Sequence, residues 1–322
     1  MGIQSKYVWM NGELVEFEKA TVHFLTPGLH YGLGAFEGIR CYNTVNGPAV
    51  FRLREHLERL LDSALILGVR DFAYTVEDLR RAVHETIRAN EFTACYIRPL
   101  IYMAHGAMGI NLDAHRSAVG IAAFEWGTLL GEEALEKGIR ATVSSFTRMH
   151  PNASMTKAKI SGNYANSVLA KTLALRSGFD EAIMLDPSGY VAECSGENLF
   201  IVRDGKIVTP PRTAILEGIT RDSVLALADD LGHTVVEEPI SRDQLYIADE
   251  VFVTGTAAEV CAICEIDFRK VGEGRMGPVT RDLQRAFFRT VRGEGGRSAE
   301  WLDYVYPAGV AVPSPKRVET TV

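Results

Sequence analysis

The alternation of hydrophobic and polar positions predicts a chain that mixes helices and strands. Near the N-terminus, YVWM and ELVEF flank Asn11-Gly12, a pair typical of a tight turn, so this segment is expected to form a β-hairpin. In FRLREHLERLLDSALILG the apolar residues repeat at helical spacing until Gly68, which predicts a helix that ends there. A second helix is expected after the cap Thr75, with Asp78 three residues further on.

Strand-like segments follow these helices and continue into the second half of the chain. CYIRPLIY and VGIAAFEW predict two strands, and later apolar segments flank Asp186-Pro187-Ser188-Gly189 and Asp204-Gly205 as hairpins. Between these groups, GTLLGEEALEKG is rich in Gly and Glu and indicates a domain boundary. We therefore predict a small N-terminal α/β domain over 1–126, a linker over 127–132 and a larger, mainly antiparallel C-terminal domain over 133–322.

Composition and charge restrict the class of protein. The 322 residues include 34 Lys and Arg against 41 Asp and Glu, a net charge of −7, and 47% are hydrophobic, as in ordinary globular proteins. The acidic balance and the lack of a basic run argue against a nucleic-acid partner. Because no apolar run approaches the roughly 18 residues of a membrane span and no signal peptide is recognisable, we expect a cytoplasmic protein with no membrane partner. The five cysteines are too sparse for a disulfide framework.

Two segments of the second domain have the features of anion sites. In EGITRDSVLALADDLG, Gly218 precedes Thr220, which we expect to cap a helix whose first N–H groups and positive dipole end attract anions. In VFVTGTAAEV an apolar strand leads into Gly255, Thr256 and Ala257, small residues that let the backbone approach an anion. Neither feature is specific by itself, because most helices begin this way without binding a phosphate. The glycine-rich fingerprints of dinucleotide and nucleoside triphosphate sites do not occur in the sequence.

One pair of lysines and one glutamate occupy unusual positions. Only nine of the 34 basic residues are lysines, and Lys157 and Lys159 lie among small and apolar residues, with Tyr164 close by. The two lysines share a face if the segment is extended, so spacing does not choose between them. Glu193 lies in a half-buried strand pattern, where it is either an edge residue facing water or a buried carboxylate that needs a partner.

Eight ordered motifs resemble the branched-chain amino acid aminotransferases of class IV, which depend on pyridoxal 5′-phosphate. They are HYGLGAFEGIRCY, REHLERLLDSA, YIRPLIY, FEWG, AKISGNYANS, AECSGENLF, EGITRD and VFVTGTAAE, and they span roughly residues 7 to 290. The resemblance implies the two-domain α/β architecture of fold type IV, with a pseudo-barrel as the C-terminal domain and the cofactor between the domains. It also implies a biosynthetic enzyme that transfers amino groups reversibly between L-leucine, L-isoleucine or L-valine and 2-oxoglutarate, by a ping-pong mechanism.

The same resemblance assigns roles in the cofactor site. Lys159 would be the catalytic residue that binds the cofactor covalently and moves a proton, while Tyr164 would bond to the cofactor's phenolic oxygen and Glu193 to its ring nitrogen. The implied phosphate ligands are Arg59, Gly218, Ile219, Thr220 and Thr256. Arg59 points away from the leucine face of its helix, where a solvated arginine is expected, so its assignment depends on the resemblance alone. No metal is implied.

The substrate pocket implied by the resemblance combines apolar and charged side chains. Its residues are Tyr31, Phe36, Gly38, Arg40, Tyr96, Arg98, Ile110, Trp126, Thr256 and Ala257. Tyr31 and Ile110 would come from a neighbouring subunit, so the active site implies a homodimer or a higher homo-oligomer. Strand alternation places Tyr96 and Arg98 on one face, where the arginine would bind the second carboxylate of the acidic acceptor.

Two relatives of the same fold remain as alternatives. An aminotransferase of (R)-amines or D-amino acids would place its carboxylate-binding groups differently, and an aminodeoxychorismate lyase would release pyruvate without an amino acceptor. The FEGIR and YIRPL motifs favour the L-branched-chain branch. The sequence also contains Cys261-Ala262-Ile263-Cys264, which two packed thiols explain better than a redox switch or a zinc site.

Overall fold

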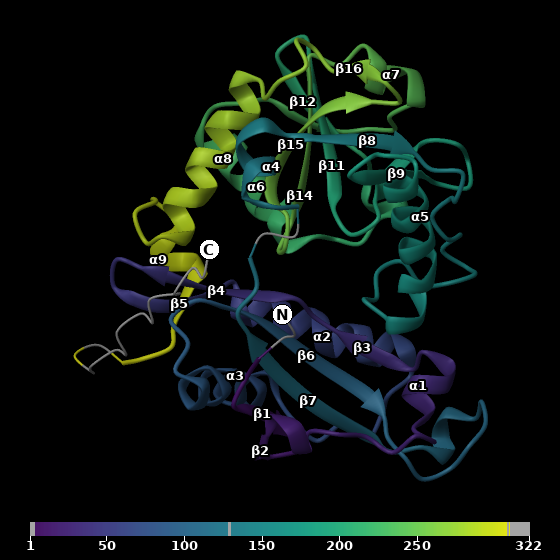
Figure 1. The fold of residues 1–322 in the computed structure, drawn as a ribbon, viewed down its shortest axis with the longest axis vertical. Coiled ribbons are helices and arrows are strands. Elements are labelled where there is room, and N and C mark those ends of the chain that lie inside the picture. Colours follow the sequence, from purple (N-terminus) through teal and green to yellow (C-terminus); the bar gives the residue numbers. More distant parts are fainter. Residues whose placement is uncertain (1–3, 128–129, 308, 310–322) are drawn as a thin grey trace. The chain divides into compact units, whose positions relative to one another are not determined.

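The computed structural model describes residues 4–127, 130–307 and 309, which divide into two compact units (Figure 1). The first unit holds the described residues up to Leu61, then Gly68–Trp126 and those from Arg289 on, and the second holds Asp62–Leu67 and Gly127–Phe288. The division passes within two helices, α2 (Leu53–Leu67) and α8 (Pro278–Val291). The domain boundaries at 126 and 133 stay a prediction, and residues 128–129 of the predicted linker lie outside the described residues.

The first unit is built on an antiparallel sheet in the order β17-β5-β4-β6-β7-β1-β2, with β3 paired to β6. Its strands are β1 (Tyr7–Met10), β2 (Glu13–Glu16), β3 (Gly34–Phe36), β4 (Ile39–Thr44), β5 (Gly47–Phe51), β6 (Cys95–Met103), β7 (Ser117–Phe124) and β17 (Leu302–Tyr304). The hairpin predicted at Asn11-Gly12 is confirmed, since β1 pairs with β2 and Met10 lies opposite Glu13. The two strands predicted from CYIRPLIY and VGIAAFEW are β6 and β7, which pair along their length.

Two long helices of the first half are confirmed as well. They are α2 and α3 (Val76–Asn90), and the shorter helices of this unit are α1 (Pro27–Tyr31) and α9 (Ser298–Trp301). At the start of α3, Thr75 and Asp78 exchange hydrogen bonds in a capping box, and the helix packs against β1 and β7. α2 ends at Leu67 because Gly68 follows with a φ of +100°, a conformation that residues with a side chain avoid.

The second unit contains a mixed sheet in the order β10-β9-β8-β15-β14-β11-β12-β13, with β16 paired to β15. Its strands are β8 (Ile139–Val143), β9 (Glu181–Leu185), β10 (Val191–Cys194), β11 (Asn198–Arg203), β12 (Lys206–Thr209), β13 (Val235–Glu237), β14 (Glu250–Gly255), β15 (Glu259–Ile266) and β16 (Arg269–Lys270). The hairpins β9–β10 and β11–β12 are antiparallel as expected. In a domain predicted to be mainly antiparallel, β8 runs parallel to both β9 and β15, and β12 runs parallel to β13.

Helices of the second unit pack on this sheet. They are α4 (Glu132–Lys137), α5 (Tyr164–Arg176), α6 (Ile219–Asp230), α7 (Arg242–Tyr246) and α8, and α5 contacts β9 while α6 contacts β14 (Figure 1). The expected N-cap of α6 was wrong: the cap is Gly218, and Thr220 lies buried inside the first turn. Among the described residues, no helix is both long and apolar enough to cross a membrane. The cytoplasmic location stays a prediction.

Candidate active site

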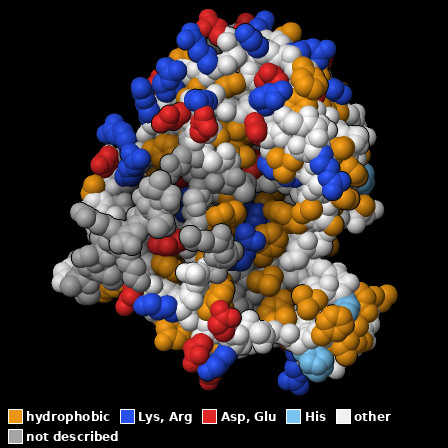
Figure 2. Space-filling model, viewed as in Figure 1, with side chains coloured by type: hydrophobic (Ala, Val, Ile, Leu, Met, Phe, Trp, Pro, Cys, Tyr) orange, Lys and Arg blue, Asp and Glu red, His pale blue; other side chains and the backbone are white. Residues whose placement is uncertain are grey.

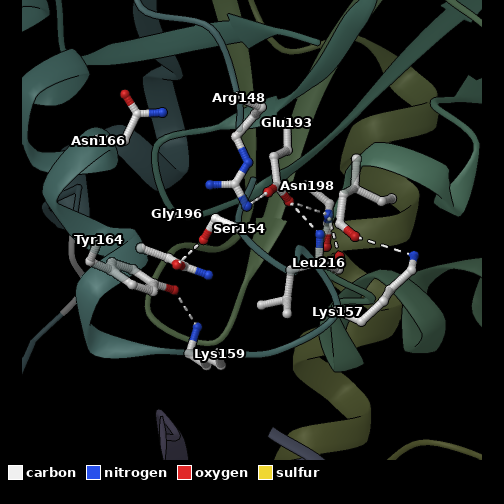
Figure 3. Close-up of polar contacts among 12 residues, drawn as sticks. Arg148, Ser154, Lys157, Lys159, Tyr164, Asn166, Glu193, Gly196, Asn198 and Leu216 are labelled. Atoms are coloured by element: carbon white, nitrogen blue, oxygen red, sulfur yellow. Dashed lines mark hydrogen bonds and ion pairs between the residues drawn. The ribbon is translucent and has the colours of Figure 1, made fainter. Parts of the chain in front are cut away.

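The predicted lysine lies beside a tyrosine in the second unit (Figure 3). Lys159 precedes α5, and its Nζ donates a hydrogen bond of 2.6 Å to the hydroxyl oxygen of Tyr164, the first residue of that helix. The backbone N–H of Lys159 donates to Ser63 Oγ at 3.0 Å, which fixes the segment that carries it. Lys157 points elsewhere: its Nζ donates to the Arg212 carbonyl and forms an ion pair of 3.1 Å with Glu217. The two lysines that spacing could not separate therefore have different surroundings, and only Lys159 contacts Tyr164.

Glu193 is a buried carboxylate, not an edge residue facing water. Its side chain on β10 is among the buried polar groups, with 6% of the residue exposed. Arg148 Nη2 forms an ion pair of 2.5 Å with Oε1, while Asn198 Nδ2 and the Leu216 N–H each donate to Oε2 at 3.1 Å (Figure 3). Burial raises the pKa of Glu193 above its usual range, against the opposing charge of Arg148 and the N–H of Leu216. Burial therefore outweighs the groups that favour the charged form of this carboxyl.

Neither of the two side chains that bind Glu193, Arg148 and Asn198, was predicted from the sequence. Arg148 lies in the loop after β8, is itself buried, and has an Nε that meets no hydrogen-bond acceptor within the described part of the chain. No periodicity or motif marks this arginine. Asn198 belongs to the AECSGENLF motif and follows Glu193 closely, so a buried amide beside a buried carboxylate was a signal that could have been used.

The first turn of α6 is where one of the two anion sites was predicted. Gly218 offers no side chain to cap the helix, and a Cβ at this position would lie 2.0 Å from Asn198 Oδ1. Position 218 therefore requires a glycine, because a side chain there would displace the Asn198 amide. In its present place the amide Nδ2 donates both to Glu193 Oε2 and, at 3.0 Å, to the Leu216 carbonyl. Ile219 follows as the first helical residue, so the backbone N–H groups and positive dipole end of a 12-residue helix begin here.

The second expected anion site is the turn between β14 and β15. Thr256 and Ala257 lie in this turn and are half-buried. Next to them at the end of β14, Thr254 Oγ1 is buried and finds no hydrogen-bond partner among the residues that the structure describes. A buried hydroxyl without a partner is unfavourable, so the turn carries a donor suited to a further polar group.

The first unit brings together five of the predicted substrate residues. Arg98 lies with its guanidinium carbon 4.9 Å from the ring centre of Phe36 and 5.4 Å from that of Tyr96. Tyr96 also meets Trp126 edge to face, with ring centres 4.7 Å apart. A Cβ on Gly38 would lie 1.9 Å from the Tyr96 hydroxyl oxygen, so glycine makes room for that hydroxyl. The predicted shared face of Tyr96 and Arg98 is confirmed, because the Arg98 guanidinium lies over the Tyr96 ring.

Arg40 and Arg59 also lie in the first unit. Arg40 on β4 is opposite Tyr96 on β6. Arg59 is not the solvated arginine that was the alternative to its phosphate role, because its Nε and Nη2 donate to Glu37 at 2.6 and 2.8 Å and its side chain is only 15% exposed. Although Arg59 points away from the leucine face of α2, its two hydrogen bonds to the buried carboxylate of Glu37 hold it against the protein.

Tyr31 and Ile110 lie on the surface of the first unit. Tyr31 ends α1 and is 41% exposed, and Ile110 is 89% exposed. Phe24 and Leu29 are also exposed there, and the His23 and His105 rings lie at an angle of 42° with centres 4.0 Å apart. Hydrophobic and histidine side chains gather on this part of the surface in Figure 2. Large apolar side chains exposed together indicate a surface that meets another protein.

The two cysteines of the C-x-x-C sequence are packed in the core of the second unit. Three positions apart on β15, they point to opposite faces of the sheet. Cys261 Sγ donates to the Ala134 carbonyl at 3.3 Å and Cys264 Sγ to the Lys137 carbonyl at 3.2 Å. Burial raises the pKa of both thiols, that of Cys261 to about 12, and so makes them unreactive. The described residues contain no group of three or more His, Cys, Asp or Glu side chains that could hold a metal ion.

Comparison with known proteins gives a consistent result. The family model of amino-transferase class IV matches residues 34–266. The branched-chain-amino-acid aminotransferase of Pseudomonas aeruginosa is 51% identical over 298 residues, which cover 92% of this chain and 97% of that protein. The solved structure of the Escherichia coli branched-chain amino acid aminotransferase matches with a TM-score of 0.92 and 48% identity, covering 94% of this chain and 100% of that chain.

A second solved structure is more distant in sequence but similar in fold. The branched-chain amino acid aminotransferase of Thermobaculum terrenum, solved in its PLP-bound holo form, matches with a TM-score of 0.88 and 35% identity, over 94% of this chain and 99% of that chain. The predicted class IV fold is thereby confirmed. With a family model that matches most of its length and a relative half identical to it, the chain belongs to class IV of the aminotransferases.

Proposed function

We propose that this chain is a branched-chain amino acid aminotransferase that depends on pyridoxal 5′-phosphate. It exchanges an amino group between L-leucine, L-isoleucine or L-valine and 2-oxoglutarate in two alternating half-reactions. The observation that carries the proposal is the contact between Lys159 Nζ and the Tyr164 hydroxyl, in the same unit as the buried carboxylate of Glu193. Relatives that match nearly the full length are named branched-chain amino acid aminotransferases, and one of them was solved in its PLP-bound form.

The donor set of the second unit fits this cofactor. It offers an amine beside a phenol, a buried carboxylate for a ring N–H and a helix N-terminus for a phosphate. It also offers the buried Thr254 hydroxyl, which has no partner among the described residues. When bound, the cofactor carries the amino group and withdraws electrons from the substrate's Cα. The remaining work falls to the side chains of the chain itself.

Lys159 and Glu193 have complementary tasks in this proposal. Lys159 Nζ attaches the cofactor and then moves a proton to or from the substrate's Cα, and the Tyr164 hydroxyl directs that nitrogen. Glu193 offers its carboxylate to the cofactor's ring nitrogen and so keeps that nitrogen protonated. Arg148 supports the charged form of Glu193 against the effect of burial. A neutral acid at this position would be a weaker partner for a ring N–H.

The phosphate is proposed to bind to backbone N–H groups and to one arginine. In the second unit, the residues are Gly218, Ile219 and Thr220 at the start of α6, and Thr256 in the β14–β15 turn. Helix N-termini bind phosphate because their first N–H groups have no partner within the helix. Arg59 of the first unit is proposed for the same phosphate group.

The substrate residues are divided between recognition of the carboxylate and of the aliphatic chain. Tyr96, together with the backbone at Thr256 and Ala257, is proposed for the α-carboxylate. The aliphatic chain is proposed to contact an apolar set formed by Phe36, Gly38, Trp126 and Tyr164, with Arg40 close to Tyr96 at the polar end. In the first unit the contacts of Tyr96 with Gly38 and Trp126 support this grouping.

Arg98 is proposed to bind the second carboxylate of glutamate and 2-oxoglutarate. Its guanidinium lies against the rings of Phe36 and Tyr96, so an apolar side chain and a carboxylate both find a favourable surface there. Arg98→Leu should lower kcat/KM for L-glutamate about a hundredfold, because a buried charge loses its partner. The L-leucine half-reaction should fall much less. Single-turnover spectra with each amino acid measure the two reactions separately, and equal losses would refute this role.

The subunit partner is proposed to be a second copy of the chain. The exposed Tyr31 and Ile110 would then complete a neighbour's pocket. α5 supports self-association, because Val168, Leu169 and Leu173 are exposed on the side opposite to its buried residues. Light scattering after gel filtration should give at least twice the mass of the chain, and a stable monomer with full activity would contradict this arrangement.

The test of the whole proposal is a spectrum and an assay of the purified protein. We expect a cofactor absorbance that L-leucine removes and 2-oxoglutarate restores. Borohydride reduction followed by peptide mapping should label Lys159, and a label on Lys157 would refute the assignment. Faster turnover of D-alanine or (R)-1-phenylethylamine than of L-leucine would select the alternative aminotransferase, and pyruvate release from aminodeoxychorismate would select the lyase.

A further inference from the structure

Glu37 is a buried carboxylate that the proposed function leaves without a role. It lies between β3 and β4, directly after Phe36 and directly before Gly38, and it is 0% exposed. Its backbone N–H donates to the Pro99 carbonyl on β6 at 3.0 Å, which fixes its main chain. A charged carboxylate cut off from water needs partners that replace the water.

Two side chains of α2 are those partners. Arg59 grips the carboxylate with two parallel hydrogen bonds, Nε to Oε1 at 2.6 Å and Nη2 to Oε2 at 2.8 Å. His56 Nδ1 lies 2.8 Å from Oε2, and His56 is as fully buried as the glutamate. The two α2 residues are three positions apart, so they point to the same side of the helix. Glu37, His56 and Arg59 thus form one buried group, in which the Gly38 N–H also donates to Glu37 Oε2 at 3.3 Å.

The charge of this group identifies what the carboxylate contributes. Burial opposes ionisation of Glu37, but the charge of Arg59 and the hydrogen bond from His56 outweigh it and hold the pKa of the carboxyl well below its usual range. An ionised carboxylate cancels part of the arginine's positive charge, which weakens its attraction for any anion. The carboxylate therefore contributes orientation instead: a two-point grip fixes both the plane and the direction of the guanidinium.

We propose that Glu37 is a positioning residue for the cofactor's phosphate. Its carboxylate, steadied by His56, holds the Arg59 guanidinium in the orientation in which it binds that phosphate. An arginine that is already fixed loses less conformational freedom when the anion arrives. This inference rests on the proposed binding of the phosphate by Arg59.

The test compares two ligands that differ only in the phosphate. The full-length protein is freed of cofactor and titrated with pyridoxal 5′-phosphate or with pyridoxal, followed by absorbance. Glu37→Gln keeps the size of the side chain but cannot accept both hydrogen bonds from Arg59. We expect its Kd for pyridoxal 5′-phosphate to rise about 10- to 100-fold, by analogy with the loss of affinity when the outer-shell partners of metal ligands are removed. Its Kd for pyridoxal should stay within about twofold of the wild type.

Further variants separate this role from a purely structural one. Asp303→Asn breaks another two-point arginine pair of the same unit, with Arg80, and should leave both Kd values unchanged. His56→Leu keeps the ion pair but removes a hydrogen bond from the carboxylate, so the Kd for the phosphorylated ligand alone should rise by about threefold or more. It serves as the second variant if Glu37→Gln does not fold.

Arg59→Gln shows which proposal fails. If Arg59→Gln weakens pyridoxal 5′-phosphate binding but Glu37→Gln and His56→Leu do not, the positioning role is overturned and the phosphate role of Arg59 stands. If Arg59→Gln binds like the wild type, the phosphate role itself is overturned. Equal losses for both ligands in the Glu37 or His56 variant would mean that the group only supports the fold. The Glu37–Arg59 double variant should lose no more affinity than the more strongly affected single variant.

Discussion

Two buried carboxylates, one in each unit, are held in opposite states of charge. Glu37 in the first unit is 0% exposed and Glu197 in the second is 3% exposed, so burial acts on both in the same direction, towards the neutral acid. For Glu37, the charge of Arg59 and the hydrogen bond from His56 outweigh the effect of burial, and the pKa falls. For Glu197, burial and the nearby carboxylate of Glu181 raise the pKa to about 8, against the charge of Lys171 and the N–H of Gly196. The groups that contact a buried carboxyl, and not its depth of burial, therefore determine the direction in which its pKa shifts.

Glu193 is a third buried carboxylate, and it differs from Glu197 in having an arginine as its direct partner. It has a direct ion pair with Arg148 and two hydrogen bonds, yet burial still raises its pKa. In the proposed role of Glu193, a protonated ring nitrogen would add a further stabilisation of the carboxylate's charge. The comparison predicts that replacing each acid by its amide has a different consequence.

The largest effect is expected for Glu37→Gln. Its unfolding free energy at pH 7 should fall by about 3 to 5 kcal/mol, because Arg59 and His56 lose a charged partner in a buried site. A lowered pKa gives stability that is present above the ordinary pKa near 4.5 and lost as the pH falls through the folded-state value. The difference between variant and wild type should therefore shrink below pH 4.5. Urea unfolding at several pH values measures this, and a variant as stable as the wild type at pH 7 would break the comparison.

Glu197→Gln is expected to act with the opposite sign. A raised pKa means that the folded state keeps a proton that the unfolded state releases, so stability falls as the pH rises from about 4.5 to about 8. The amide removes this loss, and the variant should gain on the wild type by up to about 1.4 kcal/mol per pH unit in that window. Urea unfolding of both proteins at pH 5, 6, 7 and 8 tests the trend. Parallel pH profiles would show that Glu197 is ionised like Glu37.

Glu193→Gln should retain the cofactor but lose turnover. A neutral amide stabilises the protonated ring nitrogen less, so we expect the transamination rate to fall about a hundredfold or more, equivalent to about 2.7 kcal/mol in the barrier. Steady-state assays with L-leucine, together with the absorbance of bound cofactor, measure the two properties. Glu250→Gln is the matched control, because Glu250 is a buried carboxylate of the same unit that caps the start of α8. Near wild-type turnover of Glu193→Gln would refute its role.

The smallest effect is expected for Asp303→Asn. Asp303 accepts two hydrogen bonds from Arg80, at 2.5 and 2.9 Å, much as Glu37 does from Arg59. Burial opposes its charge, but His84 and Arg80 lower its pKa to about 2. Because both partners remain partly exposed, solvent screens the pair, and the loss of stability should be only about 1 kcal/mol. A loss as large as that of Glu37→Gln, by the same urea measurement, would mean that burial does not distinguish the two pairs.

Local features of the fold were predictable because they depend on neighbours in the sequence. The Asn11-Gly12 hairpin, the capping box at Thr75 and the end of α2 at Gly68 each follow from a few adjacent residues. The N-cap of α6 was displaced by two residues, since Asn198 Oδ1 occupies the space beside Gly218 and this packing is invisible in the sequence. The parallel strand β8 was missed for the same reason, because its two partners come from distant segments.

The candidate site shows a similar limit. Motif resemblance identified Lys159 and Glu193, and the structure adds the groups that surround them. Arg148 carries no signal because a loop residue can approach any part of the fold. Glu37 stands in the FEGIR motif, yet nothing in the sequence connects it to Arg59, which reaches it from a different element.

Asn198 lies between Glu193 and Gly218, which are proposed to bind opposite ends of the cofactor. Its nitrogen bonds to Glu193, and its oxygen fills the space that any side chain at position 218 would need. A methyl group introduced at Gly218, a proposed phosphate ligand, would push the Asn198 amide away. This shift would also disturb Glu193, the carboxylate proposed to bind the ring nitrogen. With both proposed roles, a substitution at Gly218 would change phosphate binding and the charge on the ring together, so neither property would be adjustable alone through these positions.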